Sequence, residues 1–352
     1  MKAIHNYTIV QKTTTKVIEM DSWEELFLNS TRGYSKTVWV VDRKIKSFIP
    51  FSDAQIVIEL DGGDESKSLS TWTWLINKFS EFQVDRNSYI VAIGGGSISD
   101  LVGYSASVYL RGIPYSIVPS TLLSLIDASL GGKNGINLNQ QKNQVGTFYQ
   151  PANIYCVPQL IKHLPTAEMA DGFAEVIKYG LIIDRTLFDT LAATNLEKIL
   201  SNSNVFQEII NSCIIHKSNI VEEDPFESGK RRILNFGHTI GHAIESVYGL
   251  SHGKSVSIGM CFAAKMSDSK SEKTTSFLAQ LVPVLKQFQL PTKLEKFSSD
   301  LVFEKIKADK KREDDFIHFV FLNKIGTALV EKISLNDLRT IMKKAEEEKW
   351  IS

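Results

Sequence analysis

The sequence predicts an N-terminal α/β domain with a parallel sheet, followed by a mainly α-helical C-terminal domain. The first observation is a series of apolar, β-branched runs separated by helical patterns over the first 155 residues, which is typical of a parallel sheet covered by helices. The second is the dominance of helical periodicity after about residue 166. The third is the length of 352 residues, which is more than a single hydrophobic core usually serves. We therefore predict domains at residues 1–158 and 159–352.

Four strands are expected in the first domain, each from a short apolar run that ends at a turn or an acidic residue. They cover residues 37–41, 55–60, 88–93 and 115–118. Helices are expected at residues 167–183, 205–222, 239–248 and 255–266, and a later strand at 316–321. Pro151 and Pro158 flank the expected boundary between the domains.

Charge and composition exclude several classes of protein. Lys and Arg together number 40, as do Asp and Glu, so there is no net positive field to hold nucleic acid or an anionic membrane. The three cysteines are scattered and form no CxxC pair, which fits a reducing compartment and excludes a cysteine-based zinc site. The sequence also has no apolar run of about 18 residues. We expect a cytoplasmic protein with neither nucleic-acid nor membrane partners.

A glycine-rich segment, GGGSISD at residues 94–100, lies between a predicted strand and a predicted helix. Backbone amides and the positive end of a helix favour a phosphate there, although a tight strand-to-helix turn is an equal explanation. The segment is neither GxGxxG nor a Walker loop. Acidic residues end the two earlier strands, which favours a nucleotide and a Rossmann-like arrangement. The carboxylates of Asp42 and Asp64 could form hydrogen bonds with a ribose or a base edge. Lys67 could contact a phosphate or a ribose.

Three of the seven histidines lie between positions 238 and 252. His238 and His242 are four residues apart in a helical pattern, so their imidazoles leave the same face. Histidine is the commonest metal ligand and an acid/base near neutral pH; a helix with surface histidines is the alternative. Glu175 lies three residues before Lys178, either as an ion pair or as a buried carboxylate near His238 and His252. Glu plus two His would leave open positions on zinc, as in a catalytic site.

A central polar segment contains Asp127, Lys133, Lys142 and Asn143. Lysines are common in surface loops. Each of these lysines, taken alone, is therefore better explained as a solvent-exposed side chain than as a ligand contact. Donors suited to phosphate and hydroxyl groups occur further along the chain, at Lys217, Arg231, Asn235 and Lys311.

Taken together, these segments resemble those of the 3-dehydroquinate synthases, within the sugar-phosphate cyclase family. They follow the family's order over nearly the whole chain. The matching segments are GGDESKS (62–68), GGGSISD (94–100), YLRG (109–112), PSTLLSLIDASLGGKNGIN (119–137), KNQVGTFYQP (142–151), AEVIKYG (174–180), LNFGHTIGHAIE (234–245), HGKSVSIGM (252–260) and DKK (309–311).

The resemblance implies roles for the residues at matching positions. Zinc would be held by Glu175, His238 and His252, a ligand set that would also accept cobalt. NAD would contact Asp42, Asp64, Lys67, Gly95, Gly96, Ser97, Ile98, Ser99, Asp100, Ser120, Thr121, Lys133, Lys142, Leu160, Ile161, Lys162 and His163. Substrate would be held by Asp127, Lys133, Asn143, Lys178, Lys217, Arg231, Asn235, His242 and Lys311, with Arg111 reaching in from the second subunit of a homodimer. The implied catalytic residues are Lys133, Asn143, Lys178, Lys217, Arg231 and His242.

The implied activity is that of a carbon–oxygen lyase of the shikimate pathway, which leads to the aromatic amino acids. The small sugar phosphate 3-deoxy-D-arabino-heptulosonate 7-phosphate would be converted to 3-dehydroquinate and phosphate. The implied steps are NAD-dependent oxidation, phosphate elimination, re-reduction and intramolecular aldol closure. His242, one helical turn past a zinc ligand, is expected to shuttle a proton at the oxidised hydroxyl.

Three alternatives remain beside this interpretation. A related cyclase that makes an amino-dehydroquinate or a cyclitol is the nearest, although Gly131-Gly132-Lys133 and Lys142-Asn143 resemble the dehydroquinate type. A metal-dependent polyol dehydrogenase would share the architecture, but such enzymes typically have Asp where Glu175 stands. A binding module without activity would require a missing ligand or proton shuttle, and the sequence retains each of them.

Five positions depart from the family pattern. Asp64 and Lys254 each stand where Glu is usual, Asn134 replaces a frequent Thr, and Pro225-Phe226 replaces an acidic–basic pair. None of these changes removes an implied metal ligand or proton donor. They are expected to affect affinity and substrate preference more than the chemistry.

Overall fold

A computed structural model of the chain describes residues 13–139, 141–270, 275–308, 312–313 and 315–351. The chain forms two compact units. The first contains the residues up to Ser120 together with Gly132–Lys162, and the second contains Thr121–Gly131 and the residues from His163 onward. The boundary between residues 158 and 159 stays a prediction.

The first unit is built around a six-stranded parallel sheet with the strand order β1-β8-β5-β4-β2-β3. The strands of this sheet are β1 (Lys16–Glu19), β2 (Lys36–Asp42), β3 (Ile56–Leu60), β4 (Ser88–Gly94), β5 (Tyr115–Pro119) and β8 (Asn153–Cys156). The helices are α1 (Trp23–Thr31), α2 (Leu69–Glu81), α3 (Gly96–Val108) and α4 (Pro158–Lys162), and β6 (Lys133–Leu138) pairs antiparallel with β7 (Gln141–Phe148). The four predicted strands are confirmed as β2 to β5, and so is the parallel α/β fold.

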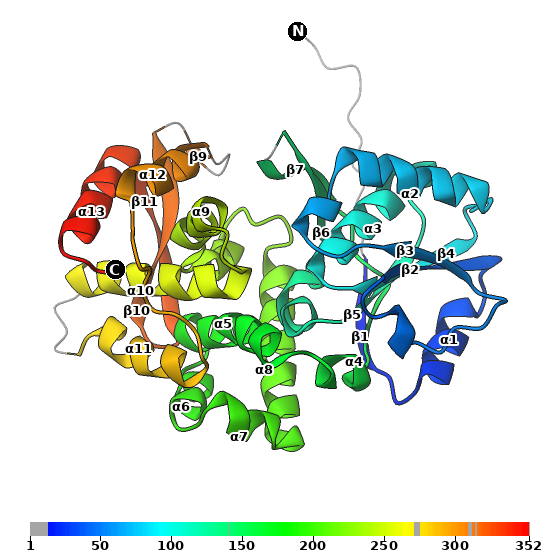
Figure 1. Cartoon of the computed structure of the whole chain (residues 1–352), viewed down its shortest axis with the longest axis horizontal. Helices are drawn as coiled ribbons and strands as arrows, with labels where there is room; N and C mark the ends of the chain where they lie inside the picture. The colour runs from blue at the N-terminus through cyan, green and yellow to red at the C-terminus, as the bar shows by residue number, and fades with distance from the viewer. Residues whose placement is uncertain (1–12, 140, 271–274, 309–311, 314, 352) are drawn as a thin grey trace, which may run out of the picture. The chain divides into compact units, whose positions relative to one another are not determined.

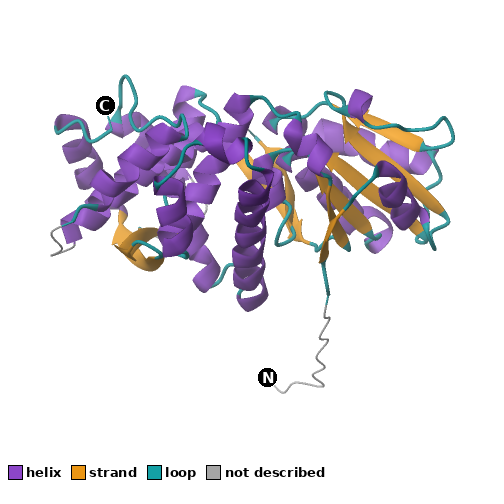
Figure 2. Cartoon of the chain, turned by 90° about the horizontal axis from the view of Figure 1, so that it is seen from below, coloured by secondary structure: helices purple, strands orange, loops and turns teal. Residues whose placement is uncertain are grey.

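Both faces of this sheet are buried, which explains why its strands read as continuous apolar runs. Val38 and Val40 of β2 pack in a core with α2 and α3, whereas Trp39 and Val41 face a second core with α1 and α4. This alternation follows from the two-residue period of a strand. Figure 1 shows α2 and α3 on one side of the sheet and α1 on the other, and Figure 2 shows its strands side by side.

The second unit is mainly helical, as predicted. Its helices are α5 (Thr166–Ile182), α6 (Arg185–Ala192), α7 (Leu196–Leu200), α8 (Ser203–Glu223), α9 (His238–Tyr248), α10 (His252–Lys270), α11 (Phe277–Gln287), α12 (Ser299–Ala308) and α13 (Leu335–Glu347). Strands β9 (Arg312–Glu313), β10 (Phe316–Lys324) and β11 (Thr327–Ser334) form a small antiparallel sheet. In the described part of the chain, every helix is too short or too polar to span a bilayer.

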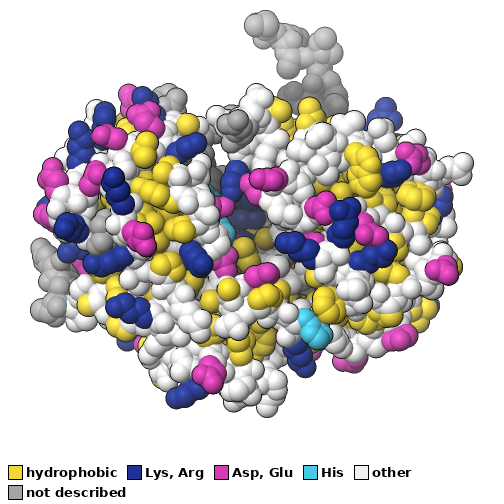
Figure 3. All heavy atoms as spheres, viewed as in Figure 1, with side chains coloured by type: hydrophobic (Ala, Val, Ile, Leu, Met, Phe, Trp, Pro, Cys, Tyr) yellow, Lys and Arg dark blue, Asp and Glu magenta, His cyan; other side chains and the backbone are white. Residues whose placement is uncertain are grey.

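Charged side chains of both signs are mixed on the surface of each unit, on the face that Figure 3 displays. This distribution agrees with the equal numbers of cationic and anionic residues in the sequence. Any strongly cationic site must therefore be built locally.

Gly103 of α3 and Asn134 of β6 share one space inside the first unit. A Cβ atom on Gly103 would lie 2.0 Å from Asn134 Oδ1. The Asn134 amide donates hydrogen bonds to the carbonyl oxygens of Gly132 and Tyr149, at 2.9 and 2.8 Å. The departure from Thr at position 134 thus has a structural counterpart, because the missing side chain of Gly103 leaves room for the longer asparagine.

Gly103→Ala is therefore expected to lower the free energy of unfolding by about 1–3 kcal/mol through overpacking, although alanine alone favours a helix interior by about 1 kcal/mol. Urea denaturation would measure the change. Adding Asn134→Thr shortens the opposing side chain and should recover part of the loss. An equal loss in the single and double variants would show that the contact with Asn134 is not the cause.

Candidate active site

Glu175, His238 and His252 lie together in the second unit, which confirms the predicted candidate metal cluster. Glu175 Oε1 is 3.2 Å from His238 Nε2 and 3.0 Å from His252 Nε2. The three potential ligand atoms all lie within 4.8 Å of one another, and Glu175 is fully buried. One carboxylate and two imidazole nitrogens that converge in this way fit a zinc ion with an open coordination position.

Close approach of three helices makes this convergence possible. Glu175 comes from the middle of α5, whereas His238 and His252 are the first residues of α9 and α10. Gly237, just before α9, has φ +76°, and its carbonyl oxygen would lie 2.1 Å from a Cβ on Gly259 of α10. A Cβ on Gly253 would lie 2.1 Å from the carbonyl oxygen of Asp171 on α5. Any larger side chain at Gly253 or Gly259 would push these helices apart.

Hydrogen bonds and burial prepare the cluster for a cation. His238 Nδ1 lies 3.0 Å from the Phe236 carbonyl oxygen, so this nitrogen carries the proton and Nε2 offers its lone pair toward Glu175. Burial lowers the pKa of His238 and favours the neutral imidazole. Burial alone would raise the pKa of Glu175, but the neighbouring charge of Lys178 holds it well below its usual range.

His252 differs from His238 in its electrostatic surroundings. Burial would lower its pKa, but interactions with Glu175 and Glu245 raise it to about 10. Its Nδ1 lies 3.6 Å from Glu245 Oε2. Without a metal, His252 therefore holds a proton between two carboxylates, and a bound cation would take the place of that proton.

His242 lies beside the metal cluster without belonging to it. Its ring centroid is 5.2 Å from that of His238 and 5.9 Å from that of His252. His242 lies one turn along α9 from His238, as the four-residue spacing in the sequence predicted. Its role as a proton shuttle stays a prediction.

Buried cations surround Asp127 in the same unit. Lys217 Nζ forms a short hydrogen bond to Asp127 Oδ1, and the Tyr179 hydroxyl donates to the same oxygen at 2.9 Å. Lys178, 1% exposed, pairs with Glu175. Burial alone would raise the pKa of Asp127, but Lys217 and Lys178 lower it to about 2. Burial, partly offset by Asp127, lowers the pKa of Lys217. The structure thus joins the metal cluster to a cationic cluster through Lys178.

Asp127 reaches this cluster from an unusual backbone. Residues Ser124–Ala128 form a π-helix, a rare conformation that is frequent at functional sites. The sequence pattern contained no signal for it, because a π-helix differs from an α-helix by a single shift of the hydrogen-bond register.

Arg231 is buried and forms hydrogen bonds with two loops. Its guanidinium donates to the carbonyl oxygens of Pro225, at 2.7 Å, and Gly131, at 3.3 Å, while its backbone N–H binds Asp224 at 3.0 Å. Pro225 takes part only through its carbonyl oxygen, which any residue would supply. The departure at this position therefore leaves the arginine anchored.

Glu227 is a residue that the sequence interpretation missed. Its Oε1 accepts a hydrogen bond of 2.6 Å from the amide of Asn235, a predicted substrate ligand. Glu227 lies in the loop after Asp224 and has φ +57°, a left-handed conformation. From this loop its side chain reaches the amide of Asn235. A lone glutamate in a short polar loop carries no periodicity, so only the folded loop identifies it.

Predicted NAD-binding residues also gather in the first unit, at the carboxyl ends of its parallel strands. Lys67, 4% exposed, lies with its Nζ 2.5 Å from Asp100 Oδ2 and also binds Asn143. Asp64 pairs with Lys142 at 3.2 Å. The Gly63 N–H donates to Ser97 Oγ at 3.0 Å, which links this loop to the start of α3. Burial raises the pKa of Asp100, and Lys67 opposes that effect.

Other predicted residues have different surroundings. In the first unit, Asp42 ends β2 and accepts from the Lys44 N–H at 3.0 Å, and the Ser120 N–H donates to the Gly94 carbonyl oxygen. Leu160 and Ile161 are buried, and Leu160 packs in the core under the sheet. Lys133, Lys162 and Arg111 are exposed there, whereas Thr121 and His163 belong to the second unit. Lys311 lies outside the described residues.

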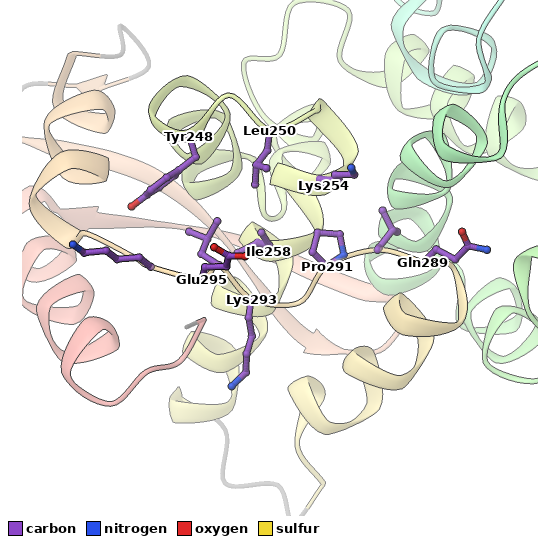
Figure 4. A pocket seen from close by; sticks show the side chains of 11 residues that line it. Tyr248, Leu250, Lys254, Ile258, Gln289, Pro291, Lys293 and Glu295 are labelled. Atoms are coloured by element: carbon purple, nitrogen blue, oxygen red, sulfur yellow. The ribbon is translucent and has the colours of Figure 1, made fainter.

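A separate cavity of about 680 Å³ lies in the second unit, between the α9–α10 corner and the segment around Pro291 (Figure 4). Its lining, within the described part of the chain, includes none of the predicted metal or substrate ligands. The Lys254 side chain lines this cavity, while the Lys254 backbone N–H binds Asp171. The departure from Glu at position 254 therefore leaves the backbone contact intact.

Comparison with known proteins agrees with this geometry. Residues 57–171 match the family model described as 3-dehydroquinate synthase N-terminal, and residues 172–312 match 3-dehydroquinate synthase C-terminal. The 3-dehydroquinate synthase of Geobacter metallireducens is 38% identical over 81% of this chain and 79% of its own length. That of Saccharolobus solfataricus is 37% identical over 88% and 89%, respectively.

A solved structure shares the fold at lower sequence identity. The 2-epi-5-epi-valiolone synthase of Streptomyces hygroscopicus, solved with NAD+ and Zn2+ bound, superposes with a TM-score of 0.85 at 21% identity, covering 98% of this chain and all of its own. The two family models together cover most of the chain, and the relatives exceed a third in identity. The chain belongs to the 3-dehydroquinate synthase family.

Proposed function

We propose that the chain is a 3-dehydroquinate synthase, a carbon–oxygen lyase that converts 3-deoxy-D-arabino-heptulosonate 7-phosphate to 3-dehydroquinate and phosphate. The observation that carries the proposal is the Glu175–His238–His252 cluster, joined through Lys178 to the buried cations around Asp127. Relatives of this name share 37–38% of their residues with the chain. A candidate metal site beside a cluster of buried cations suits a substrate with vicinal hydroxyls and a phosphate.

Two bound groups would supply chemistry that the side chains lack. When bound, zinc would polarise a substrate hydroxyl, and NAD+ would accept a hydride and later return it. Glu175, His238 and His252 are the proposed zinc ligands. The group around Lys67, Asp64 and Ser97 is the proposed NAD contact.

The remaining residues would bind substrate and move protons. Lys178, Lys217 and Arg231 place three buried positive charges around the cluster, suited to the phosphate and carboxylate of the substrate. Removing one such donor is expected to cost about 2–4 kcal/mol of transition-state stabilisation. His242 would carry the proton of the oxidised hydroxyl, and Asn235 would bind a hydroxyl once Glu227 releases its amide.

We also propose a cytoplasmic homodimer. Free Cys156, Cys213 and Cys261 support a reducing compartment. The exposed Arg111 side chain supports the proposal that one subunit contributes a guanidinium to the substrate phosphate of the other.

Phosphate release from 3-deoxy-D-arabino-heptulosonate 7-phosphate, with NAD+ and zinc present, tests the proposed function directly. Turnover is expected to stop when a chelator removes the metal, to return when zinc is added back, and to proceed without net accumulation of NADH. The product would be followed by its dehydration to dehydroshikimate. Absence of phosphate release together with NADH formation from simple polyols would make the protein a dehydrogenase instead.

A further inference from the structure

We infer that Asp171 is a positioning residue for the metal ligand His252, because its carboxylate holds the first turn of the helix that begins with that histidine. This inference rests on the proposed metal site. Asp171 lies on α5 one turn before Glu175, so the same helix supplies one ligand directly and anchors the segment that supplies another.

The contacts place the Asp171 carboxylate at the N-terminus of α10. Asp171 Oδ1 accepts a hydrogen bond of 3.1 Å from the Lys254 N–H and a short one from the Ser251 hydroxyl. The carbonyl oxygen of Asp171 packs against Gly253, where a Cβ would come within 2.1 Å. Residues 251, 253 and 254, on either side of His252, are thus all held by one residue of α5.

Such an anchor is needed because His252 stands where a helix is weakest. The first four N–H groups of a helix have no partner within the helix, and the first turn frays most readily. A carboxylate at this position satisfies one of these donors and interacts favourably with the helix dipole. By contrast, His238 is held by a residue close to it in sequence, because its Nδ1 donates a hydrogen bond to the Phe236 carbonyl oxygen.

Glu245 of α9 complements Asp171 on the ring of His252. Its carboxylate lies 3.6 Å from Nδ1, the nitrogen that faces away from Glu175. Glu245 therefore orients the imidazole, and Asp171 fixes the backbone that carries it. Residues that hold a ligand in this way typically change metal affinity 10- to 100-fold when they are removed.

Asp268, at the other end of α10, offers a matched control. Its carboxylate accepts a hydrogen bond of 2.6 Å from the Phe277 N–H and one of 2.5 Å from the Ser276 hydroxyl, at the start of α11. Asp171 and Asp268 thus cap a neighbouring helix with the same kinds of donor. Only Asp171 caps the helix end that contains a proposed metal ligand.

The test is zinc affinity, measured by competition with a chelator on the full-length protein, together with the visible spectrum of the cobalt-loaded form. Asp171→Ala is expected to weaken zinc binding about tenfold or more and to alter the cobalt absorption bands. Asp171→Asn keeps an acceptor oxygen and should retain affinity within about threefold. Asp268→Ala is expected to lower the melting temperature and leave zinc affinity and the cobalt spectrum unchanged.

Unchanged zinc affinity and cobalt spectrum in folded Asp171→Ala would overturn the inference, and so would an equal loss of affinity in Asp268→Ala. If Asp171→Ala does not fold, Asp171→Asn decides by itself: native affinity and spectrum support the inference, and a tenfold loss overturns it. Failure of the wild type to bind one zinc ion would instead refute the proposed metal site.

Discussion

Replacement of His238 with alanine is expected to leave the purified protein without stoichiometric zinc. His238 supplies one of three converging ligand atoms, and its Nε2 is 3.2 Å from the Glu175 oxygen that would share the ion. Loss of one ligand from a three-ligand site removes the geometry that zinc requires. Elemental analysis of the purified protein would measure the metal, and phosphate release would be expected to fall to the level of the chelated enzyme.

His242→Ala is the matched control for that experiment. It removes an imidazole from the same helix, one turn further along, whose ring lies 5.2 Å from that of His238. This variant is expected to keep its zinc and to turn over 10²- to 10⁴-fold more slowly, the usual contribution of general acid–base catalysis. Full zinc content in His238→Ala would contradict the ligand assignment. Zinc loss confined to His242→Ala would mean that the two histidines have exchanged roles.

Lys217→Met is expected to lower the free energy of unfolding by about 3–5 kcal/mol and to reduce kcat/KM about 10²- to 10³-fold. The loss of stability follows because the Asp127 carboxylate, which is mostly buried, would lose its closest cation. The loss of activity follows because Lys217 is a proposed phosphate or carboxylate ligand. Urea denaturation and initial rates of phosphate release would measure the two effects separately.

Two further variants separate these effects. Adding Asp127→Asn removes the charge that Lys217→Met leaves without its closest cation, so stability should partly return while activity stays low. Lys344→Met breaks an exposed pair between Lys344 of α13 and Glu348, the residue that follows this helix, and should change stability by less than about 0.5 kcal/mol. A stability loss as small in Lys217→Met as in Lys344→Met would refute the argument from burial.

Apolar periodicity was sufficient to predict the fold wherever an element is long and lies on a buried face. Strands β2 and β4 and helices α5 and α8 have such patterns, and the structure confirms them. Strands β1 and β8 contain four residues each, too few for a pattern to separate them from a loop. The sequence also gives no sign that residues 121–131 join the second unit, because that association depends on contacts distant in the chain.

The metal cluster was predictable because its residue types are rare and closely spaced in sequence. His238 and His252 are fourteen positions apart, and Glu175 stands out as a carboxylate in an apolar helix. Glu227 and Asp171 were not predicted, since each acts through a contact that only the folded chain creates. Carboxylates at such positions are indistinguishable in sequence from ordinary solvent-exposed ones.

The excursion of residues 121–131 into the second unit affects how this protein can be divided or recombined. That segment carries Asp127 to Lys217 and Tyr179, and the Gly131 carbonyl oxygen to Arg231. A gene fragment beginning at residue 159 would encode the metal ligands but leave a buried lysine and a buried arginine without these partners. The unit that holds the proposed metal ligands is therefore not encoded by one contiguous stretch of gene. Recombination between relatives is constrained to exchange residues 121–131 together with the helices that these residues contact.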